Sequence, residues 1–139
     1  VYTLLGDGEI QEGQVWEAFM FAHHYKLDNL CVIIDNNGLQ IDGAVDKVMS
    51  PYPIPDKLKA FGFAVKEIDG HDFDQIEAAF AEAKATKGVP FAIVMKTTKG
   101  KGVSYMENQA GWHGKAPNDE EYKIAMDELT AQLAEVEAM

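Results

Sequence analysis

The sequence predicts a doubly wound α/β fold built on a parallel sheet, and two observations support this prediction. Short apolar segments alternate with amphipathic segments along the 139-residue chain. Such alternation of strands and helices implies right-handed crossovers between parallel strands. In addition, three of the four apolar segments are nearly continuous rather than alternating, which is typical of strands buried on both faces of a sheet. At this length we expect one domain with a sizeable core.

The predicted strands are the four apolar segments at residues 1–5, 30–35, 63–68 and 91–95. The third is more mixed in composition than the others. We therefore expect it to lie nearer an edge of the sheet, where one side of a strand is less covered.

Four helices are predicted between and after these strands, at residues 14–25, 55–61, from residue 73, and from about residue 118. In the third helix, apolar side chains recur at spacings of three and four residues from Phe73 to Ala83. Asp72 or His71 is a suitable cap for its first turn. Residues 43–55 and 97–117 are predicted as long loops, and loops of this length are commonly functional.

The composition excludes several classes of function. The net charge is −11, from 12 basic and 23 acidic residues, whereas a nucleic-acid-binding protein usually shows a basic patch. No run of 18 apolar residues is present, so we expect no membrane span. No signal-peptide pattern occurs either, and we expect a cytoplasmic protein. The single cysteine, Cys31, lies in an apolar strand and is expected in the core.

Two turns after predicted strands carry oxygen ligands for a hard cation. Asp7 lies between Gly6 and Gly8 after the first strand, and Asn37 follows the second strand thirty residues later. Each is by itself an ordinary turn signal. Carboxylate and amide oxygens suit Mg²⁺ or Ca²⁺, and the ends of neighbouring parallel strands lie side by side. Asp7 and Asn37 are therefore predicted to bind one cation.

Mg²⁺ prefers six oxygen ligands and usually takes only some of them from protein. A backbone carbonyl near Leu39 would be a third protein ligand, which leaves positions for water and phosphate. Gly8 would also leave its backbone N–H open to a phosphate group, because it has no side chain to block the approach. A diphosphate-bearing cofactor fits this description.

Four sequence motifs strengthen this interpretation. They are GDGEIQEGQVWEA at residues 6–18, NGLQIDG at 37–43, KTTKGKG at 96–102 and WHG at 112–114. In this order they resemble the transketolases, a family of thiamine diphosphate enzymes, and particularly the stand-alone N-terminal subunit of split transketolases. The resemblance implies the thiamine diphosphate-binding fold, with residues 1–139 forming part of its diphosphate-binding domain.

The resemblance also implies a function and a site. The implied reaction is the transfer of a two-carbon ketol unit between sugar phosphates, dependent on thiamine diphosphate and Mg²⁺ or Ca²⁺. The implied metal ligands are Asp7, Asn37 and Leu39. The implied cofactor-binding residues are Gly6, Asp7, Gly8, Glu9, Asn37, Leu39 and His113.

Two residues have an implied catalytic role. His113 would face the diphosphate and the reacting end of the substrate, whereas a lone loop histidine is usually a surface residue. Glu12 would lie at a dimer interface, in an acidic cluster that links two active sites. By position alone, Glu12 is also an acid favoured by a helix dipole. Lys99 and Lys101 could approach a phosphate, but solvated loop charges are the favoured interpretation, and His71 has no evident partner.

We expect the chain to act within a larger assembly. It begins at Val1 inside a strand, whereas in the family about half of the domain precedes this point. The family's activating glutamate belongs to a pyrimidine-binding subunit or domain, so the chain alone is expected to be inactive and the assembly to be a dimer or larger. All 12 basic residues are lysine, so another segment would supply any arginine fork for a sugar phosphate.

Two alternative functions remain open. The first is the α-type subunit of a 2-oxo acid dehydrogenase, which shares the metal motif. The GDGEIQEGQVWEA and WHG strings argue against it. The second is a non-catalytic fragment that binds a partner chain.

Overall fold

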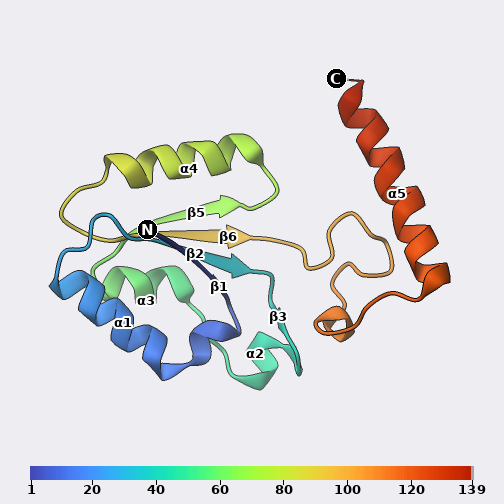
Figure 1. Cartoon of the computed structure of the whole chain (residues 1–139). Coiled ribbons are helices and arrows are strands. Elements are labelled where there is room, and N and C mark those ends of the chain that lie inside the picture. The colour runs from blue at the N-terminus through green and yellow to red at the C-terminus, as the bar shows by residue number, and fades with distance from the viewer. Residues whose placement is uncertain (139) are drawn as a thin grey trace.

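A computed structural model describes residues 1–138 and contains a four-stranded parallel sheet (Figure 1). The strands are β1 (Tyr2–Gly6), β2 (Cys31–Asn36), β5 (Ala64–Asp69) and β6 (Phe91–Lys96), in the spatial order β1-β2-β6-β5. Each boundary lies within one residue of its prediction. The mixed strand β5 lies at an edge, as expected, and β1 lies at the other edge.

Helices cover both faces of the sheet (Figure 1). One face packs against α1 (Gly13–His24) and α3 (Ile54–Ala60), and the other packs against α4 (Phe73–Ala85). Alternate residues of β2 supply the two cores, because successive side chains of a strand point to opposite faces. Val32 belongs to the core with α1 and α3, whereas Cys31 belongs to the core with α4. The doubly wound α/β fold is therefore confirmed.

Several short elements lie outside the predicted strands and helices. The hairpin strands β3 (Leu39–Gln40) and β4 (Gly43–Ala44) are followed by the single-turn helix α2 (Val45–Val48). Two 3₁₀ turns occur at Glu9–Gln11 and Ala110–Trp112. Each is too short to produce a visible hydrophobic period, so the sequence predicts residues 43–48 and 110–112 as loop.

The terminal helix α5 (Asp119–Glu137) begins where predicted, because Asn118 and Glu121 form a reciprocal capping box. It extends away from the sheet and rests on the long loop after β6 (Figure 1). The Tyr105 hydroxyl donates to the Glu121 carbonyl at 2.8 Å, and Gln132 Nε2 donates to the Gly102 carbonyl at 2.8 Å. The apolar stripe of α5 consequently stays between 41% and 66% exposed at Tyr122, Met126, Leu129, Leu133 and Val136.

All four strands run in the same direction, so their carboxyl ends share one edge. The β3–β4 hairpin and the loop after β6 both leave from this edge (Figure 1). Ligands of doubly wound sheets bind at this edge. Among residues 1–138, no helix has the length and apolar composition needed to cross a membrane.

Candidate functional site

A cavity of about 510 Å³ opens at the carboxyl ends of β1 and β2. It is lined by every residue predicted for the site: Gly6, Asp7, Gly8, Glu9, Glu12, Asn37, Leu39 and His113. Five further residues complete the lining: Gln11, Asp35, Gln40, Ile41 and Lys99. Parallel pairing of β1 and β2 brings the two turns together, since Gly6 is in register with Asp35.

Asp7 is buried, with only 1% of its surface exposed. Its Oδ2 accepts a hydrogen bond from the Gly38 N–H at 2.6 Å, but its Oδ1 is buried and has no hydrogen-bond partner among residues 1–138. Burial raises the pKa of this carboxyl above its ordinary value, and the nearby charge of Asp35 acts in the same direction. The hydrogen bond from the Gly38 N–H and the nearby backbone N–H of Gly8 oppose the rise in pKa. A buried carboxylate oxygen without a partner is costly, and a bound cation would remove that cost.

The Asn37 amide is held at both ends. Its Nδ2 donates to Asp35 Oδ2 at 3.1 Å, and its Oδ1 accepts from the Leu39 N–H at 3.0 Å. An amide oxygen has two lone pairs, so Oδ1 can still accept or coordinate once more. The amide is thus oriented with its oxygen available to the cavity that it lines.

The turn around Gly8 has no room for a side chain. A Cβ atom at Gly8 would lie 2.8 Å from Gln40 Cβ and 2.9 Å from Gln40 Oε1. Glu9 stabilises the same turn, because its carboxylate accepts from the Gly6 N–H at 3.2 Å. The exposed Glu12 immediately precedes α1 at the rim of the cavity, and its side chain makes no capping bond.

The loop after β6 brings two further nitrogen groups to the cavity. His113 Nδ1 lies 3.4 Å from Lys99 Nζ, and both residues line the cavity. Lys99 is partly exposed and lies where it could approach a phosphate group in this cavity. Lys101 differs, because it lies 3.9 Å from Glu107 and lines a neighbouring cavity.

The oxygen atoms that line this cavity suit a hard cation bound by few charged ligands. No group of three or more His, Cys, Asp or Glu side chains suited to a metal occurs among the described residues. A cation in this cavity would take one buried carboxylate and neutral oxygens, which leaves room for other oxygen ligands. The residues present thus fit a cation that also binds a phosphate group.

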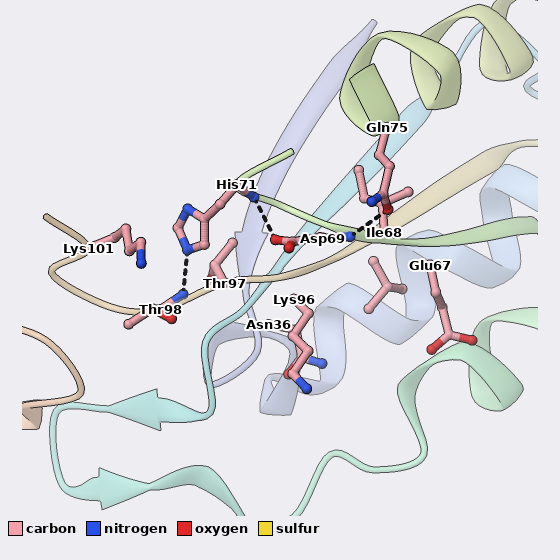
Figure 2. Close-up of a pocket in the computed structure, with 11 residues that line it drawn as sticks. Asn36, Glu67, Ile68, Asp69, His71, Gln75, Lys96, Thr97, Thr98 and Lys101 are labelled. Atoms are coloured by element: carbon pink, nitrogen blue, oxygen red, sulfur yellow. Dashed lines mark hydrogen bonds between the residues drawn. The ribbon is translucent and has the colours of Figure 1, made fainter. Parts of the chain in front are cut away.

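A second cavity, of about 640 Å³, lies beside the first at the ends of β5 and β6 (Figure 2). The Thr98 N–H donates to His71 Nε2 at 2.8 Å, and the His71 N–H donates to Asp69 Oδ1 at 2.9 Å (Figure 2). The prediction that His71 lacks a partner is therefore wrong: it connects the start of α4 to the loop that carries Lys99. The cap of α4 is Asp72, whose side chain accepts from the Gln75 N–H.

Asn36 and Asn37 line different cavities although they are adjacent in the sequence. Asn36 lines the second cavity, and its Oδ1 accepts from the Tyr52 hydroxyl at 3.0 Å. Asn37 lines the first. Successive side chains leaving a strand point in opposite directions, which accounts for the separation.

Comparison with known proteins identifies relatives of this sequence. A relative from Clostridium sp. (strain MSTE9), the 6-deoxy-6-sulfo-D-fructose transketolase subunit SqwG, is 43% identical over 134 residues, covering 96% of this chain and 49% of that protein. An apulose-4-phosphate transketolase subunit from Phocaeicola vulgatus is 43% identical, covering 98% of this chain and 48% of that protein. The chain thus spans about half the length of these curated relatives.

Solved structures agree with the sequence relatives. Transketolase from Campylobacter jejuni superposes with a TM-score of 0.84 at 36% identity, covering 91% of this chain and 20% of that one. Transketolase from Pichia stipitis in complex with sedoheptulose-7-phosphate also superposes with a TM-score of 0.84. It is 31% identical, and the match covers 91% of this chain and 19% of that one. Residues 1–135 match the family model described as "Transketolase, thiamine diphosphate binding domain". The chain therefore belongs to the transketolase family, and it carries thiamine diphosphate binding domain sequence over nearly its whole length.

Proposed function

We propose that this chain binds thiamine diphosphate through a divalent cation, Mg²⁺ or Ca²⁺, at the carboxyl ends of β1 and β2. The proposed protein ligands are Asp7, Asn37 and the backbone carbonyl of Leu39. The observation that supports this most directly is the buried Asp7 Oδ1, which has no partner among residues 1–138. A hard divalent cation in the adjoining cavity would supply one.

The diphosphate would lie against the turn at Gly6 to Gly8. The absence of a side chain at Gly8 lets its backbone approach a phosphate oxygen. Glu9 would contribute indirectly, because its carboxylate holds the Gly6 N–H and so fixes the turn. Lys99 and His113, from the loop after β6, line the same cavity and would donate to phosphate oxygens.

The proposed reaction is transfer of a two-carbon ketol unit between sugar phosphates. When bound, thiamine diphosphate supplies the electron sink for cleaving a ketose next to its carbonyl. His113 would donate a hydrogen bond or move a proton at the reacting end of the substrate. The relatives named above act on different sugars, so they support the reaction class rather than one substrate.

The proposed active form is an assembly of at least two chains, located in the cytoplasm. Two relatives are named as subunits of transketolases, which supports a partner that carries the pyrimidine-binding domain. Glu12 lies exposed at the cavity rim, where a dimer partner could reach it. No observation favours a 2-oxo acid dehydrogenase.

Substitution of Asp7 tests the cation site. In the assembled enzyme, Asp7→Ala should abolish Mg²⁺-dependent binding of thiamine diphosphate, because the only charged ligand is lost. Asn37→Ala should weaken binding less, since one neutral oxygen is removed. Asn36→Ala is the matched control and should bind almost normally. Calorimetric titration of the cofactor in excess Mg²⁺ measures all three, and equal affinities for Asp7→Ala and the unaltered enzyme would exclude Asp7 as a ligand.

A further inference from the structure

We propose that Asp35 is a positioning residue that holds both cation ligands, Asp7 and Asn37, in place. The inference rests on the proposed function, and it assigns a role to a residue that was not predicted for the site. Asp35 lies one residue before the end of β2, between the turn after β1 and the loop after β6.

Three hydrogen bonds converge on Asp35. Its backbone carbonyl accepts from the Asp7 N–H at 3.1 Å, and its Oδ2 accepts from Asn37 Nδ2 at 3.1 Å. Its Oδ1 accepts from the Thr97 hydroxyl. One residue therefore connects the two proposed ligands to each other and to the end of β6.

The bond to Asn37 helps to fix which end of the amide faces the cavity, together with the Leu39 N–H that donates to the amide oxygen. Rotation about the terminal torsion would exchange the amide oxygen and nitrogen, and only the oxygen can bind a cation. An ionised carboxylate only accepts hydrogen bonds, so Asp35 selects the orientation in which Nδ2 points toward it. The oxygen is then left for the Leu39 N–H and for the cavity.

Asp35 is better suited to positioning than to coordination. Both of its carboxylate oxygens already accept hydrogen bonds, from Asn37 and Thr97, whereas Asp7 Oδ1 accepts none among the described residues. Its negative charge nevertheless acts on the same site, because it lies close enough to affect the Asp7 carboxyl. It would thus attract a cation without occupying a ligand position.

Three substitutions separate the two ways in which the Asp35 side chain would favour cation binding: its hydrogen bonds, which position Asn37, and its negative charge. Asp35→Ala removes the hydrogen bonds of the carboxylate and its charge, whereas the backbone bond from the Asp7 N–H to the residue 35 carbonyl remains in every variant. Asp35→Asn removes the charge but can keep the geometry, because its amide oxygen can accept from Asn37 while its amide nitrogen donates to the Thr97 hydroxyl. Thr97→Val removes the hydrogen bond from the Thr97 hydroxyl to the Asp35 carboxylate and leaves the charge of Asp35 unchanged.

The experiment is a titration of Mn²⁺ and of Mg²⁺ in the assembled enzyme at saturating thiamine diphosphate. Bound Mn²⁺ is followed by electron paramagnetic resonance, and cofactor binding by fluorescence. Asp35→Ala should raise the cation concentration at half-saturation by about 10–100-fold, as is typical when a hydrogen-bond partner of a ligand is removed. Asp35→Asn should recover part of that loss, and Thr97→Val should give a smaller shift. Asn36→Ala, from the same strand end, is the control and should not shift it.

Thermal unfolding without cation distinguishes positioning from a general effect on folding. The inference holds if Asp35→Asn unfolds like the unaltered protein and still binds cation more tightly than Asp35→Ala. It is overturned if Asp35→Ala leaves the cation titration unchanged, or if Asp35→Asn shows no recovery. Failure of the proposed function looks different, because Asp7→Ala would then also leave the cation titration unchanged.

Discussion

Asp7 combines a charge, burial and an unmatched oxygen in one side chain. Its pKa is raised chiefly by burial, so the folded protein binds the Asp7 proton more tightly than the unfolded chain does. Without a cation, this carboxyl therefore favours folding most below the ordinary Asp range, and that contribution is lost as the pH rises through the raised pKa. In the cation-free protein the ionised form of this carboxyl is disfavoured, because the side chain is buried and its Oδ1 has no hydrogen-bond partner among the described residues.

Asp7→Asn should consequently stabilise the cation-free protein at pH 7 while destroying the cation site. The gain should be on the order of 1 kcal/mol, because a neutral amide with one unmatched group costs less to bury than an unmatched charge. Urea denaturation between pH 4 and pH 8 measures it, and the difference should shrink toward low pH as Asp7 takes up a proton. Added Mg²⁺ should stabilise the unaltered protein only. A variant less stable than the unaltered protein at pH 7 would contradict this account.

His113 lines the cavity beside Lys99 but is not one of the proposed cation ligands. His113→Ala should therefore lower kcat more than it weakens cofactor affinity. General acid–base groups contribute about 10²–10⁴-fold, and a group that acts in the transition state affects kcat. Steady-state kinetics of the assembled enzyme at saturating cofactor measure the loss. A normal kcat would leave His113 as an ordinary loop residue.

At the scale of elements, the loop after β6 depends on Gly100. Its φ is +73°, and a Cβ atom there would lie 2.6 Å from the Met106 carbonyl oxygen. Gly88 has a similar φ of +79° but open space around it. Gly88→Ala should therefore cost only backbone strain, about 1–2 kcal/mol, whereas Gly100→Ala should also displace the loop.

Because this loop carries Thr97 and Lys99, Gly100→Ala should weaken cofactor binding as well as stability. Gly88→Ala, which lies before β6, should lower stability with unchanged cofactor affinity. Thermal unfolding combined with cofactor titration distinguishes the two variants. Equal cofactor affinities would show that the loop backbone tolerates the displacement.

The strands were predictable because buried parallel strands are continuous apolar runs with polar turns at their ends. The closeness of Asp7 and Asn37 was predictable, because each follows such a run within a few residues and parallel pairing aligns the strand ends. The partner of His71 was not, since Thr98 lies on a different segment and their contact depends on tertiary packing. The hydrogen bonds of Asp35 to Asn37 and Thr97 were not predictable either. An aspartate at a strand end that is followed by Asn36 has the same local pattern as an ordinary turn.

At the scale of the whole molecule, exposed apolar side chains gather on surfaces away from the two cores. On β1, Tyr2 and Leu4 are 58% and 66% exposed. At the end of α1, Phe21 and the capping residue Tyr25 are 57% and 59% exposed. The stripe of α5 adds a third such surface. Exposed apolar patches of this kind mark interaction sites, in agreement with the proposed assembly.

We expect residues 1–139, purified alone, to show no ketol transfer with thiamine diphosphate and Mg²⁺. Activity should appear only with a partner that carries the pyrimidine-binding domain. Size-exclusion chromatography with light scattering should then show at least a dimer, and Glu12→Ala should weaken that assembly more than Glu17→Ala, a matched change on α1. Clear turnover by the isolated chain would disprove the shared active site.

The order β1-β2-β6-β5 has a consequence for how the chain acquires its structure. The inner strand β6 is the last of the four to be synthesised, and it is the sheet neighbour of both β2 and β5. Until Phe91 to Lys96 leave the ribosome, β5 has no strand to pair with. Distant pairings of this kind are slow to form, and unpaired strand edges promote aggregation. In the emerging chain, β5 therefore stays unpaired and one edge of β2 stays open until β6, which lies between them, is made.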